Sequence, residues 1–101
     1  MFNLNEKTMD AYQHKINAQV KEMKAKMMML ESEAEKSSAD MRIKYQSKVD
    51  ELKPRFKEIE KKLNQLSDSS EDAWKEIQTG IDQSMSELRI ALENVTKHFN
   101  N

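Results

Sequence analysis

Apolar residues recur every three or four positions along almost the whole chain, a spacing typical of amphipathic α-helices. A first stripe runs through Met9, Tyr12, Ile16, Val20, Met23, Met27, Leu30, Ala34, Met41, Tyr45, Val49, Leu52, Phe56, Ile59, Leu63 and Leu66. A second stripe runs through Trp74, Ile77, Ile81, Met85, Leu88, Leu92, Val95 and Phe99. Much of the spacing alternates three and four, as in the seam of a coiled coil. The pattern predicts an all-α protein.

The two stripes are separated by a segment that reads "SDSSED" from residue 67 to residue 72. Ser and Asp side chains compete for backbone hydrogen bonds, so they favour helix caps and turns. Ser69 is suited to be the N-cap of the following helix. The segment therefore predicts a single coiled-coil domain over 1–101, with a helix over about 5–66, a turn at 67–69 and a helix over about 70–99. So short a connection makes the two helices antiparallel neighbours.

The core of this predicted hairpin follows from the two stripes. It comprises Tyr45, Leu52, Phe56, Ile59, Leu63, Leu66, Trp74, Ile77, Ile81, Leu88 and Leu92. Trp74 is the only tryptophan, and its place at the start of the second helix predicts that it covers Leu63 and Leu66. Pro54 lies inside the first stripe, and we expect it to kink the helix without ending it.

Charge supports the same pairing. Residues 37–66 carry a net charge of +3 and residues 67–101 a net charge of −4, whereas residues 1–36 are neutral. Segments of opposite charge attract each other. We therefore expect the middle and last segments of the chain to pack together.

The second helix is long enough to cover the first only back to about residue 41, which leaves residues 9–36 with an apolar stripe and no partner. A lone amphipathic helix is marginal in water. This predicts a homo-oligomer, a dimer or larger, whose interface comprises Tyr12, Ile16, Val20, Met23, Met27 and Leu30. The alternative is a second turn in "EKSSAD", at 35–40, and a three-helix spectrin-like bundle. The continuous helix is preferred because that segment contains no Gly, Pro or Asn and the stripe crosses it in register.

The sequence contains no constellation typical of catalysis or of cofactor or metal binding, and none is predicted. The chain has no cysteine, and His14 and His98 stand alone without a metal-binding motif. The most basic stretch, "KPRFKEIEKK", is interrupted by acidic residues, so no nucleic-acid partner is expected. The N-terminal ten residues lack the features of a signal peptide, which together with the absence of cysteine favours a cytoplasmic location.

Two functions fit a charged helical chain of this kind. The first is a non-enzymatic structural or interaction protein that acts by self-association or by binding another protein. The second is an amphipathic-helix binder of lipid or other hydrophobic surfaces, like apolipoprotein or phasin helices, and the cluster Met27-Met28-Met29-Leu30 is its main support. A membrane partner is disfavoured because residues 1–36 have no excess of Lys or Arg.

The segments "ADMRIKYQSKVDEL" (39–52) and "DAWKEIQTGIDQSMSEL" (72–88) resemble a group of small bacterial coiled-coil proteins associated with stress responses. The Ala73-Trp74 pair, Gly80 and Ile81 stand where the pattern of that group has them. The resemblance implies a non-enzymatic, cytoplasmic role connected with stress tolerance. It implies no catalytic residues.

Overall fold

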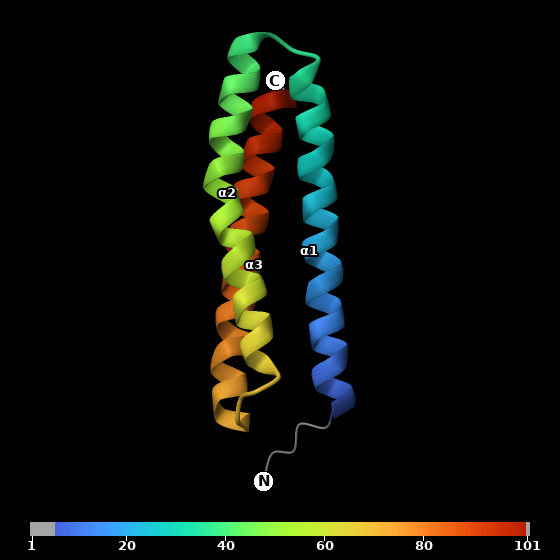
Figure 1. Ribbon diagram of the computed structural model, residues 1–101, viewed down its shortest axis with the longest axis vertical. Coiled ribbons are helices and arrows are strands. Elements are labelled where there is room, and N and C mark those ends of the chain that lie inside the picture. Colours follow the sequence, from blue (N-terminus) through green and yellow to red (C-terminus); the bar gives the residue numbers. More distant parts are fainter. Residues whose placement is uncertain (1–5, 101) are drawn as a thin grey trace.

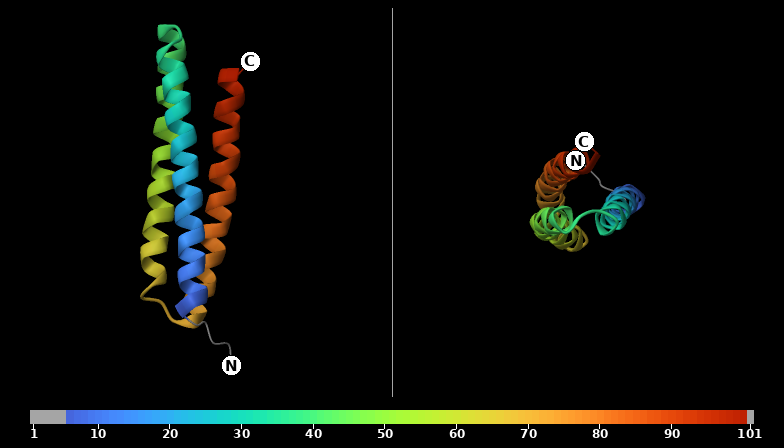
Figure 2. Two further views of the ribbon diagram at one scale, coloured as in Figure 1. Left: turned by 90° about the vertical axis from the view of Figure 1, so that its right-hand side faces the viewer. Right: turned by 90° about the horizontal axis from the view of Figure 1, so that it is seen from above.

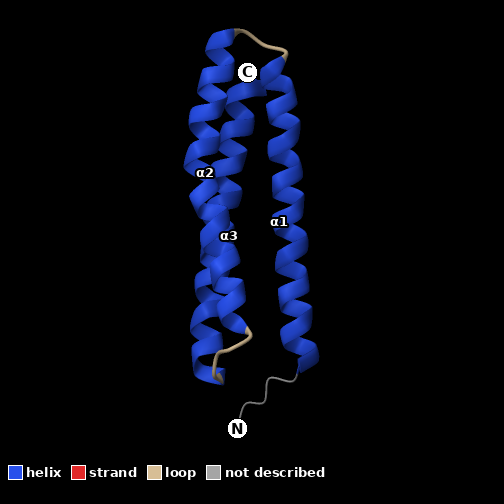
Figure 3. Ribbon diagram, viewed as in Figure 1, coloured by secondary structure: helices blue, strands red, loops and turns tan. Residues whose placement is uncertain are grey.

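The computed structural model describes residues 6–100, with side chains for residues 7–98. It contains three helices: α1 (Glu6–Glu35), α2 (Ala39–Leu66) and α3 (Glu71–Asn100). No strand occurs among the described residues, and the prediction of an all-α chain is confirmed (Figure 3). The expected helix start at residue 5 lies outside the described residues. Residues 1–5 of the N-terminal segment, for which no signal peptide was predicted, lie outside them as well.

The helices lie lengthwise against one another in an elongated molecule of 58 × 19 × 18 Å. In Figure 1, α1 and α3 run in the same direction and α2 runs in the opposite direction. The end-on view in Figure 2 places the three helices around a common axis. The contact between α2 and α3 is the most extensive of the three, as the opposite charges of these segments predicted.

The expected continuous helix over 5–66 is not what the structure shows, because α1 ends at Glu35 and α2 begins at Ala39. Two adjacent serines make this turn without Gly, Pro or Asn. The Ser37 hydroxyl donates a hydrogen bond of 3.0 Å to the Glu33 carbonyl, which satisfies the end of α1. The Ser38 hydroxyl accepts a bond of 3.3 Å from the Met41 amide and is the N-cap of α2. Capping side chains therefore replace the turn residues on which the prediction relied.

The second turn repeats the same arrangement. The Ser69 hydroxyl donates a hydrogen bond of 2.8 Å to the Leu66 carbonyl at the end of α2. The Ser70 hydroxyl accepts a bond of 3.3 Å from the Ala73 amide at the start of α3. The N-cap is thus Ser70 and not Ser69, and the turn is one residue longer than predicted. In both turns the first serine completes one helix and the second serine starts the next.

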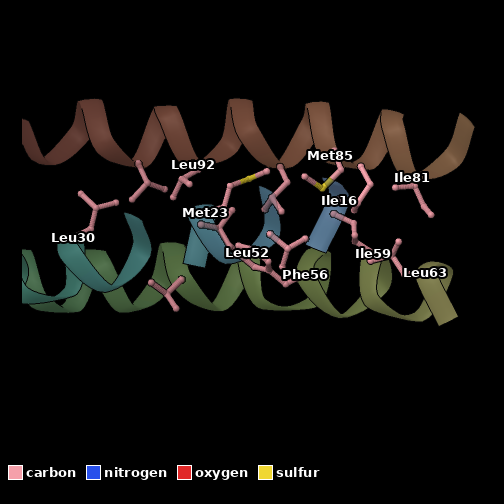
Figure 4. Close-up of a cluster of buried hydrophobic side chains, with 14 of the residues drawn as sticks. Ile16, Met23, Leu30, Leu52, Phe56, Ile59, Leu63, Ile81, Met85 and Leu92 are labelled. Carbon is pink, nitrogen blue, oxygen red and sulfur yellow. The ribbon is translucent and has the colours of Figure 1, made fainter. Parts of the chain in front are cut away.

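The six residues assigned to an oligomer interface lie inside the chain instead. Ile16, Val20, Met23 and Leu30 are buried, and Tyr12 and Met27 are half-buried against the same core. The break at 36–38 folds α1 back along α2 and α3, so its apolar stripe finds partners within one chain. The prediction that the stripe of residues 9–36 has no partner within the chain is therefore wrong, because the core of this chain contains residues of all three helices (Figure 4).

The residues assigned to the hairpin core occupy the same interior. Ile77 is half-buried, and it packs against the other ten. These ten are buried: Tyr45, Leu52, Phe56, Ile59, Leu63, Leu66, Trp74, Ile81, Leu88 and Leu92. Pro54 lies on the exposed side of α2, and the helix continues through it from Ala39 to Leu66. An exposed position lets water reach the carbonyl that proline leaves without a hydrogen-bond donor.

The serine caps give a testable prediction. Ser38→Ala and Ser70→Ala should each lower the free energy of unfolding by about 1 kcal/mol, because each removes the acceptor of an otherwise unpaired backbone amide. Urea unfolding followed by circular dichroism measures the loss. Ser47→Ala, at an exposed position inside α2, is the control and should change stability little. Equal effects at all three positions would contradict the assignment of caps.

Gly80 gives a second prediction, of opposite sign. It lies in the interior of α3, where a Cβ atom would meet only the flexible end of Lys62, with Nζ at 3.5 Å. Gly80→Ala should therefore raise the free energy of unfolding by about 0.5–1 kcal/mol, the usual difference between the two residues inside a helix. A shift of the urea midpoint to lower concentration would show that close helix approach at this position requires glycine.

Candidate helix-docking groove between α1 and α3

One end of α1 is fixed to α3 by an aromatic contact and two hydrogen bonds. The rings of Tyr12 and Trp74 meet edge to face, with centroids 5.3 Å apart. The Tyr12 hydroxyl lies 2.7 Å from Oδ1 of Asp82 and 3.3 Å from the Gln78 carbonyl. Burial, and then the hydrogen bond and negative charge of Asp82, raise the pKa of Tyr12 far above its usual range. The phenol therefore stays protonated and acts as a donor to both oxygens.

Further along the chain, α1 is held by α2. The Tyr45 hydroxyl donates a hydrogen bond of 2.7 Å to the Met27 carbonyl, and burial is the main cause that raises its pKa. Lys24 forms an ion pair of 2.7 Å with Glu60 and lies 5.9 Å above the ring of Phe56. These contacts hold the middle of α1 toward α2 and not toward α3.

As a result, α1 and α3 leave an open groove of about 580 Å³ between them, beyond the Tyr12 contact. Its floor consists of the buried side chains of Met23, Leu30 and Leu92. Figure 4 shows Met23 beside Leu92, with Leu30 further along the same line. Met29 lies at the edge of the groove with 67% of its surface exposed. The contact between α1 and α3 is the least extensive of the three.

Charged side chains form the two rims of the groove. The α1 rim carries Glu22, Lys26 and Glu33, and the α3 rim carries Arg89, Glu93 and Lys97. All six are exposed, and Glu22 pairs with Lys26 along α1 at 3.7 Å. Among the described residues, none of the three α3 charges takes part in an ion pair. The groove thus combines an apolar floor with solvated charges that have no partner across it.

The order of these charges along the groove follows from the register of α1 and α3. Both helices run in the same direction, and Tyr12 lies level with Gln78 and Asp82. Because both helices rise by about 1.5 Å per residue, Glu22 lies close to the level of Arg89. By the same count, Lys26 lies close to the level of Glu93. From Glu22 to Lys26 the α1 rim therefore changes from acidic to basic, and at the same levels the α3 rim changes from basic to acidic. Glu33 and Lys97 continue the alternation on the two rims.

The predicted site residues and this groove overlap only in part. Met23 and Leu30, assigned to an oligomer interface, form its floor, as does Leu92 of the predicted hairpin core. The rim residues were not singled out from the sequence. One signal was present, since Met28 and Met29 lie outside the apolar stripe and are both exposed in the structure.

No cluster of three or more His, Cys, Asp or Glu side chains that could hold a metal ion occurs in the part of the chain that the structure describes. None of the described helices combines the length and the apolar character that are needed to cross a membrane.

Searches of protein-family models, curated proteins and solved structures find no match to this chain. The resemblance to small bacterial coiled-coil stress-response proteins therefore stays a prediction from the residues.

Proposed function

We propose that this protein is a non-enzymatic interaction protein that binds a helical surface of a protein partner in the groove between α1 and α3. The observation that carries the proposal is the groove itself, which offers an apolar floor, an exposed methionine and two rims of exposed charges that form no ion pair across it. Helix-in-groove recognition uses these features: apolar anchors give affinity and rim charges choose the partner and its orientation. A helix laid in the groove would add a fourth helix to the three.

The proposal depends on one chain closing into three packed helices, with α1 docked on the antiparallel α2–α3 hairpin and parallel to α3. The serine caps at both turns and the shared core support this arrangement. If α1 instead extended away from the hairpin, it would take one wall of the groove with it. The groove therefore exists only if the chain closes into the three-helix arrangement.

The absence of cysteine allows a direct test, because one introduced cysteine can carry an environment-sensitive fluorophore. Met29→Cys places the dye at the edge of the groove. Met28→Cys is the matched control, since Met28 is equally exposed (69%, against 67% for Met29) but does not line the groove. The probe partner is a synthetic amphipathic helix with a leucine seam and mixed charges on its flanks.

We expect this peptide to shift the emission of the dye at position 29 to the blue in a saturable manner and to leave the dye at position 28 unchanged. Vesicles of neutral and anionic phospholipid form the second arm. A shift of both dyes by vesicles, with none by the peptide, would replace the proposal with the lipid-binding alternative. No shift at position 29 with the peptide at hundreds of micromolar would overturn it.

A further inference from the structure

We infer that the partner of the α1/α3 groove is the same groove of a second copy of this chain, and that the two copies pair with their helices parallel. The inference rests on the proposed function and names its partner. Its basis is the order of charges on the two rims, which makes this face complementary to itself when two parallel copies overlap fully.

In the parallel orientation, a two-fold axis along the groove sets α1 of each copy opposite α3 of the other at the same level. Glu22 of one copy then faces Arg89 of the second copy, and Lys26 faces Glu93 of the second copy. Because the symmetry repeats each contact, four pairs of opposite charge form across the interface. The α3 charges that have no ion pair in the single chain obtain one in this arrangement.

The antiparallel orientation has a two-fold axis across the groove, which sets α1 opposite α1 and α3 opposite α3. The groove is lined by residues 19–33 of α1 and 89–97 of α3, so the axis passes near the middle of both segments. Lys26 then faces Lys26 of the second copy, and Glu93 faces Glu93. Like charges placed opposite each other disfavour an interface. With the two grooves in full overlap, the charge pattern therefore favours the parallel pair. An antiparallel pair sets Glu22 opposite Lys26, and Arg89 opposite Glu93, only when its axis lies about two residues, or about 3 Å, away from the centre of the groove.

The apolar contribution to this interface is small. The floor is already covered within the chain, so the new burial comes from Met29 and from the aliphatic stems of Lys26, Arg89 and Lys97. The α1 segment of the groove is about 21 Å long at 1.5 Å per residue, and the face is only two helices wide. An interface of this size belongs to the small, transient class. We therefore expect a dimer with a dissociation constant in the micromolar range or weaker.

Charge reversal tests this pairing in the full-length protein. Lys26→Glu and Glu93→Lys each turn two attractive contacts of the symmetric dimer into repulsive ones, so each variant alone should dimerise at least about tenfold more weakly than wild type. An equimolar mixture of the two variants should dimerise again, because every altered side chain then faces its opposite. The chain that carries both substitutions should also recover the dimer. Sedimentation equilibrium from micromolar to millimolar concentration measures all four.

The control is Lys61→Glu, which makes the same change of charge at an exposed site of α2 outside the groove. It should leave the dimer unchanged. Circular dichroism of each variant checks that the fold is retained. The dye on Met29→Cys gives a second readout that requires no change of charge, because its emission should shift to the blue as the concentration of unlabelled wild-type protein rises.

Three results would overturn the inference. A wild-type monomer at millimolar concentration would exclude self-pairing, and the peptide titration would still report separately on the groove as a docking site. A dimer that tolerates both reversals would lie on another face. Failure of the mixture and of the double variant to recover the dimer would show an antiparallel pair in which Glu22 faces Lys26 and Arg89 faces Glu93.

Discussion

Trp74→Ala should lower the free energy of unfolding by about 3–5 kcal/mol, as large-to-small changes in a core do. Only 3% of the Trp74 surface is exposed, and its ring contacts Tyr12 of α1 edge to face. The substitution therefore loosens the junction of α1 with α3 as well as the α2–α3 turn. Urea unfolding followed by circular dichroism measures the loss, and a loss below about 1 kcal/mol would contradict the assignment of Trp74 to the core.

Trp74→Phe is the informative companion. The indole Nε1 of Trp74 is buried and has no hydrogen-bond acceptor among the described residues. Phenylalanine retains an aromatic ring against Tyr12 and removes this unpaired donor, so its loss should be clearly smaller than that of alanine. A loss as large as that of alanine would indicate that the indole N–H has a partner in the folded protein. Trp74 is the only tryptophan, so the emission of wild type should be blue-shifted in native buffer and shift to the red on unfolding.

Met23→Asp should lower the free energy of unfolding by at least about 3 kcal/mol, because it places a short charged side chain where no partner can reach it. Met23 is only 4% exposed and lies between the helices beside Leu92. Since α1 shares one core with α2 and α3, the whole fold should lose stability in a single transition. Circular dichroism and tryptophan emission, recorded during urea unfolding at low micromolar concentration, should give the same midpoint.

The matched control is Met28→Asp, which makes the same substitution on the same helix at a position that is 69% exposed. It should cost less than about 1 kcal/mol, most of it from the lower helix propensity of Asp. If Met23→Asp melted α1 alone and left the tryptophan transition unchanged, α1 would be independent of the hairpin. That outcome would favour the extended first helix that the sequence predicted.

The positions of the apolar stripe were sufficient to predict the helices and most of the core. Apart from Met41, each residue of the two apolar stripes from Ile16 to Val95 is buried or packs against the core. The periodicity works because the same face of each helix is buried along its whole length. It does not reveal whether that face is covered by the same chain or by another copy, and this is where the prediction of an unpartnered first helix failed.

The first turn could have been recognised from the second. The chain reads Ser37-Ser38-Ala39-Asp40 at one turn and Ser69-Ser70-Glu71-Asp72 at the other, and the serine pairs form equivalent hydrogen bonds. A pair of serines followed by an acidic residue in the first turn was therefore a stronger signal than the absence of Gly, Pro and Asn. The repeat is visible in the sequence, and the absence of Gly, Pro and Asn does not exclude a turn that serine side chains cap.

The groove could not have been predicted in the same way. In the sequence, Lys26 and Glu93 look like any other exposed charges of a helix. Only the fold, which places α1 parallel to α3, shows that they lie at the same height on opposite rims of the groove. The exposed methionines gave a partial signal, because Met29 is at the groove and Met28 is not. The packing of the three helices, and not the sequence pattern, separates these two neighbours.

The most direct test of this account is the distance between spin labels on Lys15→Cys and Lys61→Cys in one chain, measured by pulsed electron paramagnetic resonance. Both lysines are exposed, and their neighbours Gln13, Asn17, Glu60 and Asn64 line one surface depression between α1 and α2. Labelled protein is diluted with unlabelled protein so that only distances within one chain are counted. Packed helices have axes about 8–10 Å apart, so we predict a distance below about 30 Å including the label arms. A continuous helix through residues 36–38 would separate the labels by about 70 Å, and that distance would contradict both the closed three-helix chain and its groove.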